Sequence, residues 1–77
     1  MLVRFFAGAA DAAGRTQTEV EPPPTVGDLV ATLSRDDERL TAVLEVSTFL
    51  VSGRRADADA PLLPTDVVDV LPPFAGG

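Results

Sequence analysis

The two most apolar, strand-forming segments of this 77-residue chain lie at its opposite ends, in residues 2–7 and 67–71. A domain of this size buries only about 60% of the surface that its unfolded chain exposes, so one thin core must hide both segments. A single sheet with both as adjacent central strands, covered by one main helix, is the simplest solution. Because a crossover joins them, we expect a parallel central pair flanked by antiparallel partners, which is a mixed sheet of the α+β class.

The N-terminal part of the chain predicts a hairpin. Its first strand covers residues 2–7, and alternate residues from Val3 to Ala7 share the core face. Residues 8–14 are small and turn-prone, so we expect a loop that ends this strand. Residues 16–21 predict a second strand with one solvated face, and the three prolines that follow stop any ladder pairing.

A helix is predicted from Thr25 onward. The Thr25 hydroxyl can accept a hydrogen bond from the Asp28 amide, and the Asp28 charge favours a helix N-terminus. The apolar residues that follow form one helical stripe, which we interpret as core: Val26, Leu29, Val30 and Leu33. Residues 40–44 continue a helical spacing, so the polar residues 34–38 either end the first helix or cap a short second one.

Residues 48–51 predict a third strand, and Ser52-Gly53 signals a turn into a return strand that begins at Arg54-Arg55. The two arginines could bind an anion, although paired arginines beside a turn are more often simply solvated.

Residues 56–64 are acidic, small and bounded by prolines, and we expect a loop that tucks Leu62 and Leu63 inward. The last strand follows over residues 67–71 and ends at a pair of prolines, which cannot donate a ladder hydrogen bond. The whole chain, residues 1–77, therefore reads as one domain.

The composition narrows the functions that are open to the chain. Twelve carboxylates against six arginines give a net charge of −6, which disfavours nucleic-acid binding and favours either simple solubility or a partner with a basic face. Without cysteine or histidine the chain has no thiolate metal site and no common general base, so an independent enzyme is the weakest interpretation. The apolar first residues are too short for a signal peptide or a membrane span, so we expect a cytoplasmic protein that contacts no membrane.

The chain ends in Leu71-Pro72-Pro73-Phe74-Ala75-Gly76-Gly77. The prolines favour an extended exit from the globular part, residues 1–72, and the glycines lack Cβ atoms, so residues 73–77 predict a thin, flexible tail. Such a tail, ending in a free carboxylate, can pass through a narrow channel into the active site of another protein. A frayed terminus is the plain alternative.

Three segments of the chain resemble the MoaD/ThiS family. They are Phe5-Phe6-Ala7, Thr25-Val26 with Leu29, and Pro72-Pro73-Phe74-Ala75-Gly76-Gly77. The resemblance is stronger to the MoaD branch, the small subunit of molybdopterin synthase, and the order of elements matches over essentially the whole chain. It implies a ubiquitin-like β-grasp fold, and the tail is its most specific motif.

The resemblance also implies a chemistry. In that family a MoeB-like enzyme, similar to ubiquitin-activating enzymes, uses ATP and magnesium to adenylate the terminal carboxylate, and sulfur then displaces AMP. The thiocarboxylate enters the MoaE-like large subunit and supplies the dithiolene sulfur of molybdopterin. By this resemblance Gly77 carries the sulfur, Gly76 gives clearance, and the chain itself binds no cofactor or metal. Docking is then expected through Leu71, Pro73, Phe74 and Ala75.

Phe6 is a further candidate for docking. By alternation it lies opposite the core face, and we expect it in an exposed apolar patch with Leu2 and with Val67 or Leu71. Such a patch on a small domain indicates a binding face. The alternative is that a loop covers it.

The chain departs from the family pattern at three places. Ala10 stands where members often have an arginine, which puts any partner salt bridge made there in doubt. Thr65-Asp66 replaces a common Gly-Asp turn, and the turn type is expected to differ because a threonine is strained in a left-handed position. Ser52 replaces the asparagine of an Asn-Gly turn.

Three functions are open on the sequence. The first is the sulfur donor of molybdopterin synthase. The second keeps the carrier mechanism but delivers sulfur to thiamine, cysteine or a tRNA base. The third is a protein modifier that joins Gly77 to a target lysine, or an interaction module that does not use the terminus.

Overall fold

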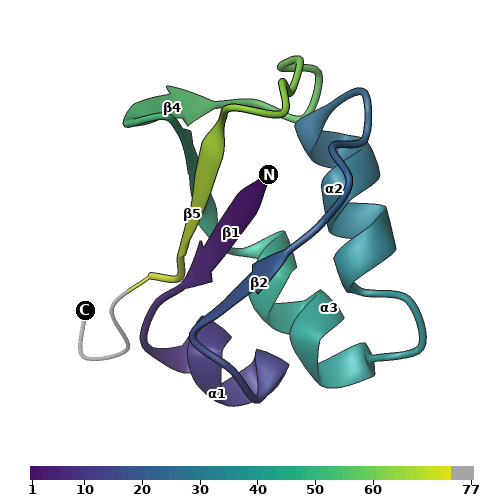
Figure 1. Cartoon of the computed structure of the whole chain (residues 1–77). Coiled ribbons are helices and arrows are strands. Elements are labelled where there is room, and N and C mark those ends of the chain that lie inside the picture. The colour runs from purple at the N-terminus through teal and green to yellow at the C-terminus, as the bar shows by residue number, and fades with distance from the viewer. Residues whose placement is uncertain (74–77) are drawn as a thin grey trace.

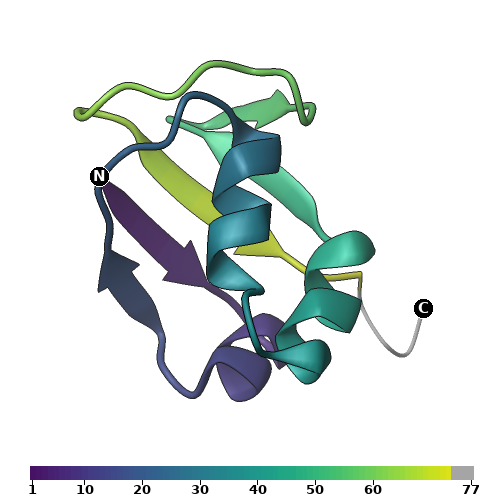
Figure 2. The same cartoon turned by 90° about the vertical axis from the view of Figure 1, so that its right-hand side faces the viewer.

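A computed structural model describes residues 1–73 and contains a five-stranded sheet with helices on one side and at one end (Figures 1 and 2). The elements in chain order are β1 (Leu2–Phe5), α1 (Gly8–Ala13), β2 (Gln17–Glu19), α2 (Val26–Leu33), α3 (Glu38–Glu45), β3 (Thr48–Val51), β4 (Arg54–Ala56) and β5 (Val67–Leu71). The strands lie in the order β2-β1-β5-β3-β4.

The two ends of the described chain meet in the middle of this sheet. β1 and β5 pair in parallel, with Val3 opposite Val68 and Phe5 opposite Val70. β2 and β3 flank this pair in antiparallel orientation, and β4 continues the sheet beyond β3. The predicted mixed sheet with a parallel central pair is therefore confirmed.

The core lies between this central pair and the helices α2 and α3. Val3, Val68 and Val70 are fully buried on the sheet side, and Leu29 and Leu44 lie on the helix side. The expected apolar stripe of α2 faces this core, since Val26 and Leu29 are buried while Val30 and Leu33 are half-buried. The burial of these side chains is the main force that holds helix and sheet together.

Strand bounds agree with prediction at β3 and β5, but β1 ends earlier than expected. Ala7, predicted to extend the core face, has φ 49° and ψ −125°, which ends the strand at Phe5. The prediction of a loop over residues 8–14 is wrong, because residues 8–13 form α1. Ala9 is fully buried there, and Gly14 closes the helix in a left-handed conformation.

Both interpretations of residues 34–38 are confirmed, because α2 ends at Leu33 with Ser34 as its C-cap and a second helix begins at Glu38. Asp37 caps α3, and its carboxylate accepts a hydrogen bond from the Leu40 amide at 3.0 Å. α3 thus adds a second covering helix beside α2. In the loop before β5, Leu62 is buried as expected, but the prediction for Leu63 is wrong, because 60% of this residue is exposed.

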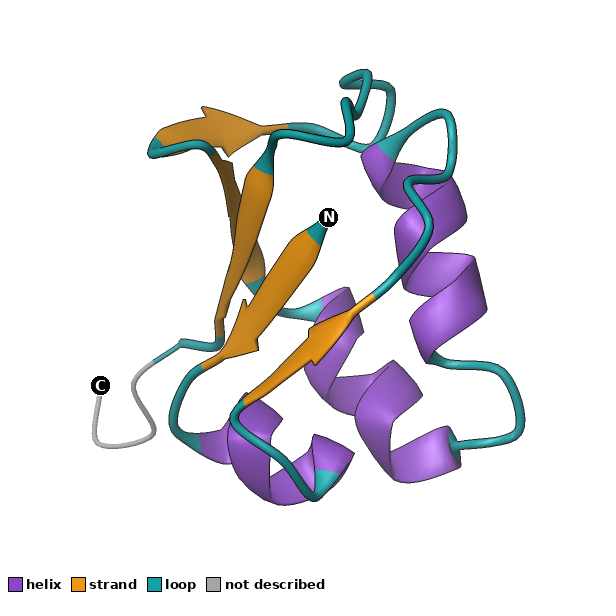
Figure 3. Ribbon diagram, in the orientation of Figure 1, coloured by secondary structure: helices purple, strands orange, loops and turns teal. Residues whose placement is uncertain are grey.

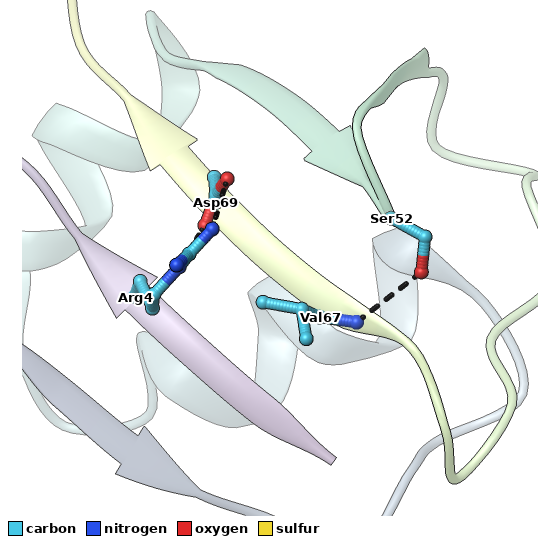
Figure 4. Close-up of polar contacts among 4 residues, drawn as sticks. All are labelled: Arg4, Ser52, Val67 and Asp69. Atoms are coloured by element: carbon cyan, nitrogen blue, oxygen red, sulfur yellow. Dashed lines mark hydrogen bonds and ion pairs between the residues drawn. The ribbon is translucent and has the colours of Figure 1, made fainter.

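The turn between β3 and β4 is tied to the start of β5. Thr65 does not take a left-handed conformation, as expected from the change of turn type. Ser52, which stands in place of the asparagine, does take it, with φ 48°. The Ser52 hydroxyl donates to Asp66 at 2.8 Å. It also accepts from the Val67 amide at 3.4 Å (Figure 4). These bonds anchor the beginning of the central strand.

The first turn of α2 is completed by the loop that precedes β5. The Thr25 hydroxyl accepts from the Asp28 amide as predicted, while the amides of Val26 and Gly27 donate to the carbonyls of Ala60 and Ala58. A Cβ on Gly27 would lie 3.2 Å from the Ala58 carbonyl oxygen. Glycine at this position therefore permits the close approach of the loop.

We expect Gly27→Ala to be less stable than Gly8→Ala by about 1 kcal/mol or more, although both exchanges favour a helix equally on propensity. Gly8 has open space around its Cβ position, whereas the Gly27 substitution pushes against backbone. Urea unfolding followed by circular dichroism measures the difference. Equal stability of the two variants would mean that the loop before β5 can move away from Gly27 without loss of stability.

Candidate functional site: the open face and the start of the tail

One face of the sheet is left uncovered by the helices (Figure 3). Alternation along β1 and β5 directs every second side chain onto this face. We call it the open face, and its central residues are Leu2, Arg4, Phe6, Leu50, Val67, Asp69 and Leu71. All of them are exposed or half-buried, in contrast to the buried residues between them.

Phe6 lies at the edge of the open face where the described chain leaves the sheet. Its amide donates to the Val70 carbonyl at 3.2 Å, which continues the parallel pairing and sets Phe6 beside Leu71. Phe6 is 41% exposed, as predicted, and no loop within residues 1–73 covers it. Leu2, which was predicted to share its patch, lies at the other end of β1, with Arg4 between them on the same face. Phe6 and Leu71 together form an apolar surface at the point where β5 ends.

Ala7 ends the first strand and turns the chain directly after Phe6. Its φ of 49° with ψ of −125° is unusual for a residue with a Cβ atom and costs conformational energy. The Ala7 carbonyl accepts from the amides of Ala10 and Asp11, so α1 holds the turn in place. Phe6 itself is directed onto the open face by the alternation of β1.

An ion pair crosses the middle of the open face. The Arg4 Nε and Nη2 donate to the two carboxylate oxygens of Asp69 at 2.6 and 2.9 Å (Figure 4). These bonds and the carboxylate charge raise the pKa of the Arg4 guanidinium above its usual value, so the group stays protonated. The guanidinium also lies 6.0 Å from the centre of the Phe6 ring, close enough for a cation–π contact.

The sequence patterns described above did not predict this ion pair. The parallel register places Arg4 directly opposite Asp69, and Asp69 is the one charged residue in β5. A single charged residue in an otherwise apolar last strand is therefore the sequence feature that could have predicted the ion pair.

The tail leaves from the centre of the sheet. β5 ends at Leu71, which pairs with Thr48 on one side and neighbours Phe6 on the other. Pro72 is half-buried and Pro73 is exposed, so the expectation of an exit at the prolines is met as far as the structure describes it. The predictions for Phe74, Ala75, Gly76 and Gly77 lie outside the described residues.

The remaining features considered in the sequence are the arginine pair, a metal site and a membrane span. Arg54 and Arg55 lie exposed on β4, and no ion pair is found for them within residues 1–73. In the same residues, no three carboxylates, histidines or cysteines cluster as a metal site would require. None of the helices described has the length and apolarity needed to cross a membrane.

Comparison with known proteins agrees with this geometry. The model of the ThiS family matches residues 3–77. No curated protein matches in sequence. Among solved structures, a protein of Pyrococcus furiosus assigned as molybdopterin converting factor subunit 1 is 28% identical, with a TM-score of 0.82 and 95% coverage of both chains.

Two further structures share the fold. A chain from the complex of subunits 1 and 2 of molybdopterin-converting factor of Helicobacter pylori is 25% identical, with a TM-score of 0.70 over 99% of this chain and 96% of that one. The small archaeal modifier protein 1 of Methanosarcina acetivorans is 21% identical, with a TM-score of 0.84 over 99% and 94%. At that identity the second likeness concerns the fold alone.

Adjacent phenylalanines allow a matched test of the two faces. We expect Phe5→Ala to lower the free energy of unfolding by about 3 kcal/mol or more, because Phe5 is buried and its removal leaves a cavity. Phe6→Ala should change it by less than about 1 kcal/mol. Urea titration followed by circular dichroism gives both values, since the chain has no tryptophan or tyrosine to report by fluorescence. A comparable loss in both variants would show that Phe6 serves the fold instead.

Proposed function

Because the chain belongs to the ThiS family, we propose that it is a sulfur carrier whose working group is the terminal carboxylate of Gly77. The observation that carries this proposal is the family match itself, which runs through residue 77 and so includes both terminal glycines. The fold supports it, because the central strand β5 leads through two prolines directly into these residues.

The chemistry of loading is an exchange at the acyl carbon. A carboxylate is a poor electrophile until one oxygen becomes part of a good leaving group. An oxygen of Gly77 therefore attacks the α-phosphorus of ATP, and pyrophosphate leaves together with its magnesium ion. Hydrosulfide then attacks the acyl carbon and releases AMP, which leaves a thiocarboxylate on Gly77. Where the sulfur arrives instead as the persulfide of a donor, the attack gives an acyl disulfide, and a thiol cleaves its S–S bond by forming a disulfide with the donor.

The catalytic groups for these steps come from partners. The chain has no histidine and no cysteine, and the carrier role requires neither. A MoeB-like adenylating enzyme would bind ATP and magnesium and activate Gly77. Dependence on ATP favours a cytoplasmic setting for the reaction.

We infer that the recipient is a MoaE-like large subunit of molybdopterin synthase. The Pyrococcus furiosus protein is assigned as subunit 1 of molybdopterin converting factor, and the Helicobacter pylori chain comes from a complex of subunits 1 and 2 of that factor. In this role Gly76 gives the tail clearance, and Pro73, Phe74 and Ala75 contact the large subunit on the way to its active site.

The open face is the natural place for the partner to bind. Phe6 and Leu71 supply exposed apolar surface beside the exit of the tail. The Arg4–Asp69 pair cancels its own charge on a chain of −6, so a partner covers the middle of the face without burying a lone charge. A partner seated there would receive the tail at a fixed point.

A second candidate is a ubiquitin-like modifier, which would use the same terminal Gly76-Gly77 pair. A modifier would join Gly77 to the lysine of a target. This chain contains no lysine, so one copy could not be attached to a lysine of another. Conjugates would therefore contain no copies of the chain linked to one another through lysine. A carrier that delivers sulfur to thiamine, cysteine or tRNA would form no conjugates at all.

Loading is tested by intact mass. Incubated with ATP, magnesium, a sulfur source and a MoeB-like enzyme, the chain should gain the mass difference between sulfur and oxygen. Deletion of Gly77 should abolish the gain, because the remaining terminus is one residue short of the activating site. Leu63→Ala, at an exposed position in the loop before β5, serves as the control and should load normally. Normal sulfur loading of the chain without Gly77 would refute the carrier role.

Docking is tested separately. Phe6→Ser should weaken binding to the large subunit at least about tenfold, because aromatic anchors commonly account for 2 kcal/mol or more of binding energy. Leu63→Ser removes a similarly exposed apolar side chain before β5 and should leave the affinity unchanged. Calorimetric titration of both variants against the large subunit gives the two values. Equal losses would show that the open face is not the docking surface.

A further inference from the structure

A groove of about 320 Å³ lies on the covered side of the sheet, between the edge strand β2 and the end of α2. Both views of the chain place β2 at the margin of the sheet, with α2 across from it (Figures 1 and 2). The apolar part of its lining comes from Phe5, Val20, Leu33 and Leu40. Its volume is near the lower limit of ligand pockets, about 300 Å³, so it suits one or two side chains better than a large cofactor.

The backbone of β2 is available along this groove. In the antiparallel pair of β1 and β2, the Phe5 amide donates to the Thr16 carbonyl and the Val20 amide donates to the Met1 carbonyl. Residues two apart share the same direction of hydrogen bonding, so the N–H and C=O groups of Gln17 and Glu19 point away from the sheet. These groups offer an added strand a place to pair.

The rim of the groove is basic although the chain as a whole is acidic. Arg15 and Arg35 line it, and Arg15 donates to the Thr18 hydroxyl at 3.3 Å, which holds its side chain over β2. The one carboxylate of the lining, Asp37, already accepts the Leu40 amide as the cap of α3. Glu19 shares the direction of Leu2, toward the open face, and its carboxylate lies 3.6 Å from the Met1 amino group.

We propose that this groove binds an extended segment of a partner protein, which pairs with β2 as a sixth strand. One large apolar side chain of the segment enters the groove between Val20 and Leu33, and an acidic residue beside it faces Arg15 and Arg35. The site lies on the opposite side of the sheet from the open face, so both can be occupied together. It does not depend on the sulfur chemistry proposed for the tail.

The test uses an acetylated and amidated peptide of sequence Asp-Asp-Val-Leu-Val-Leu, titrated into the ¹⁵N-labelled full chain. We expect saturable shifts of the amides from Gln17 to Val20 and of Leu33 and Leu40. The amides of Gln17 and Glu19 should also exchange more slowly with solvent. A peptide with lysines in place of the aspartates should bind at least about tenfold more weakly, because its charge opposes that of the rim.

Two charge reversals locate the site. Arg35→Glu should weaken the binding of the acidic peptide at least about fivefold. Arg55→Glu, on the opposite edge strand β4, should leave the affinity for this peptide unchanged. Arg35 is exposed, so the variant is expected to fold, and its amide spectrum confirms this. Equal effects of the two reversals would indicate attraction to charge alone and would overturn the proposal.

Three further outcomes would also overturn it. One is an affinity weaker than about 1 mM for the acidic peptide. Another is a set of shifts confined to the open face around Phe6 and Leu71. The third is a concentration-dependent shift of the groove amides without peptide, which would identify a second copy of the chain as the occupant.

Discussion

The parallel pairing of β1 with β5 is the contact on which the rest of the structure depends. Parallel strands need a crossover, and here nearly the whole chain serves as that crossover. The pairing buries Val3, Val68 and Val70 completely, so the thin core of a small domain is concentrated on one pair of strands. Both flanking strands find their register against this pair.

The same register determines which residues of the central strands face the core and which lie on the open face. A shift of one residue would exchange the faces of a strand, so the burial of Val68 and Val70 also fixes the outward direction of Asp69 and Leu71. The Arg4–Asp69 pair then joins the two central strands on the open face, as their valines do on the other. Its energy is modest at this exposure, and its main effect is to hold charge in a fixed, cancelled arrangement.

Much of this fold was readable from the sequence because its strongest signals are local. The bounds of β3 and β5, the cap of α2 at Thr25 and the central pairing follow from alternation, turn residues and helical spacing. α1 was not readable, since its short run of alanine and glycine has no periodic pattern. Its helix depends on tertiary contact, namely the burial of Ala9 and the packing of α1 against α3.

The candidate site was predictable in part for a related reason. Exposure of Phe6 follows from alternation, and its position beside Leu71 follows from the parallel pairing. The unusual backbone conformation of Ala7 could not be predicted from the sequence, because alanine has no preference for a φ of 49°. The exposed position of Leu63 was missed as well, since an apolar residue in a loop carries no sign of the side on which it lies.

A chain without histidine or cysteine, if it acts as the proposed carrier, contributes mainly by where it places its terminus. β5 does this in one strand: its buried residues hold the sheet together, its outward residues shape the open face, and its end sets where the tail begins. The strained turn at Ala7 comes directly after Phe6, and the hydrogen bond of Phe6 to Val70 places the residue beside that exit. The stability of the sheet and the placement of the open face and the start of the tail therefore depend on the same few residues. A change in the register of β5 would disturb both.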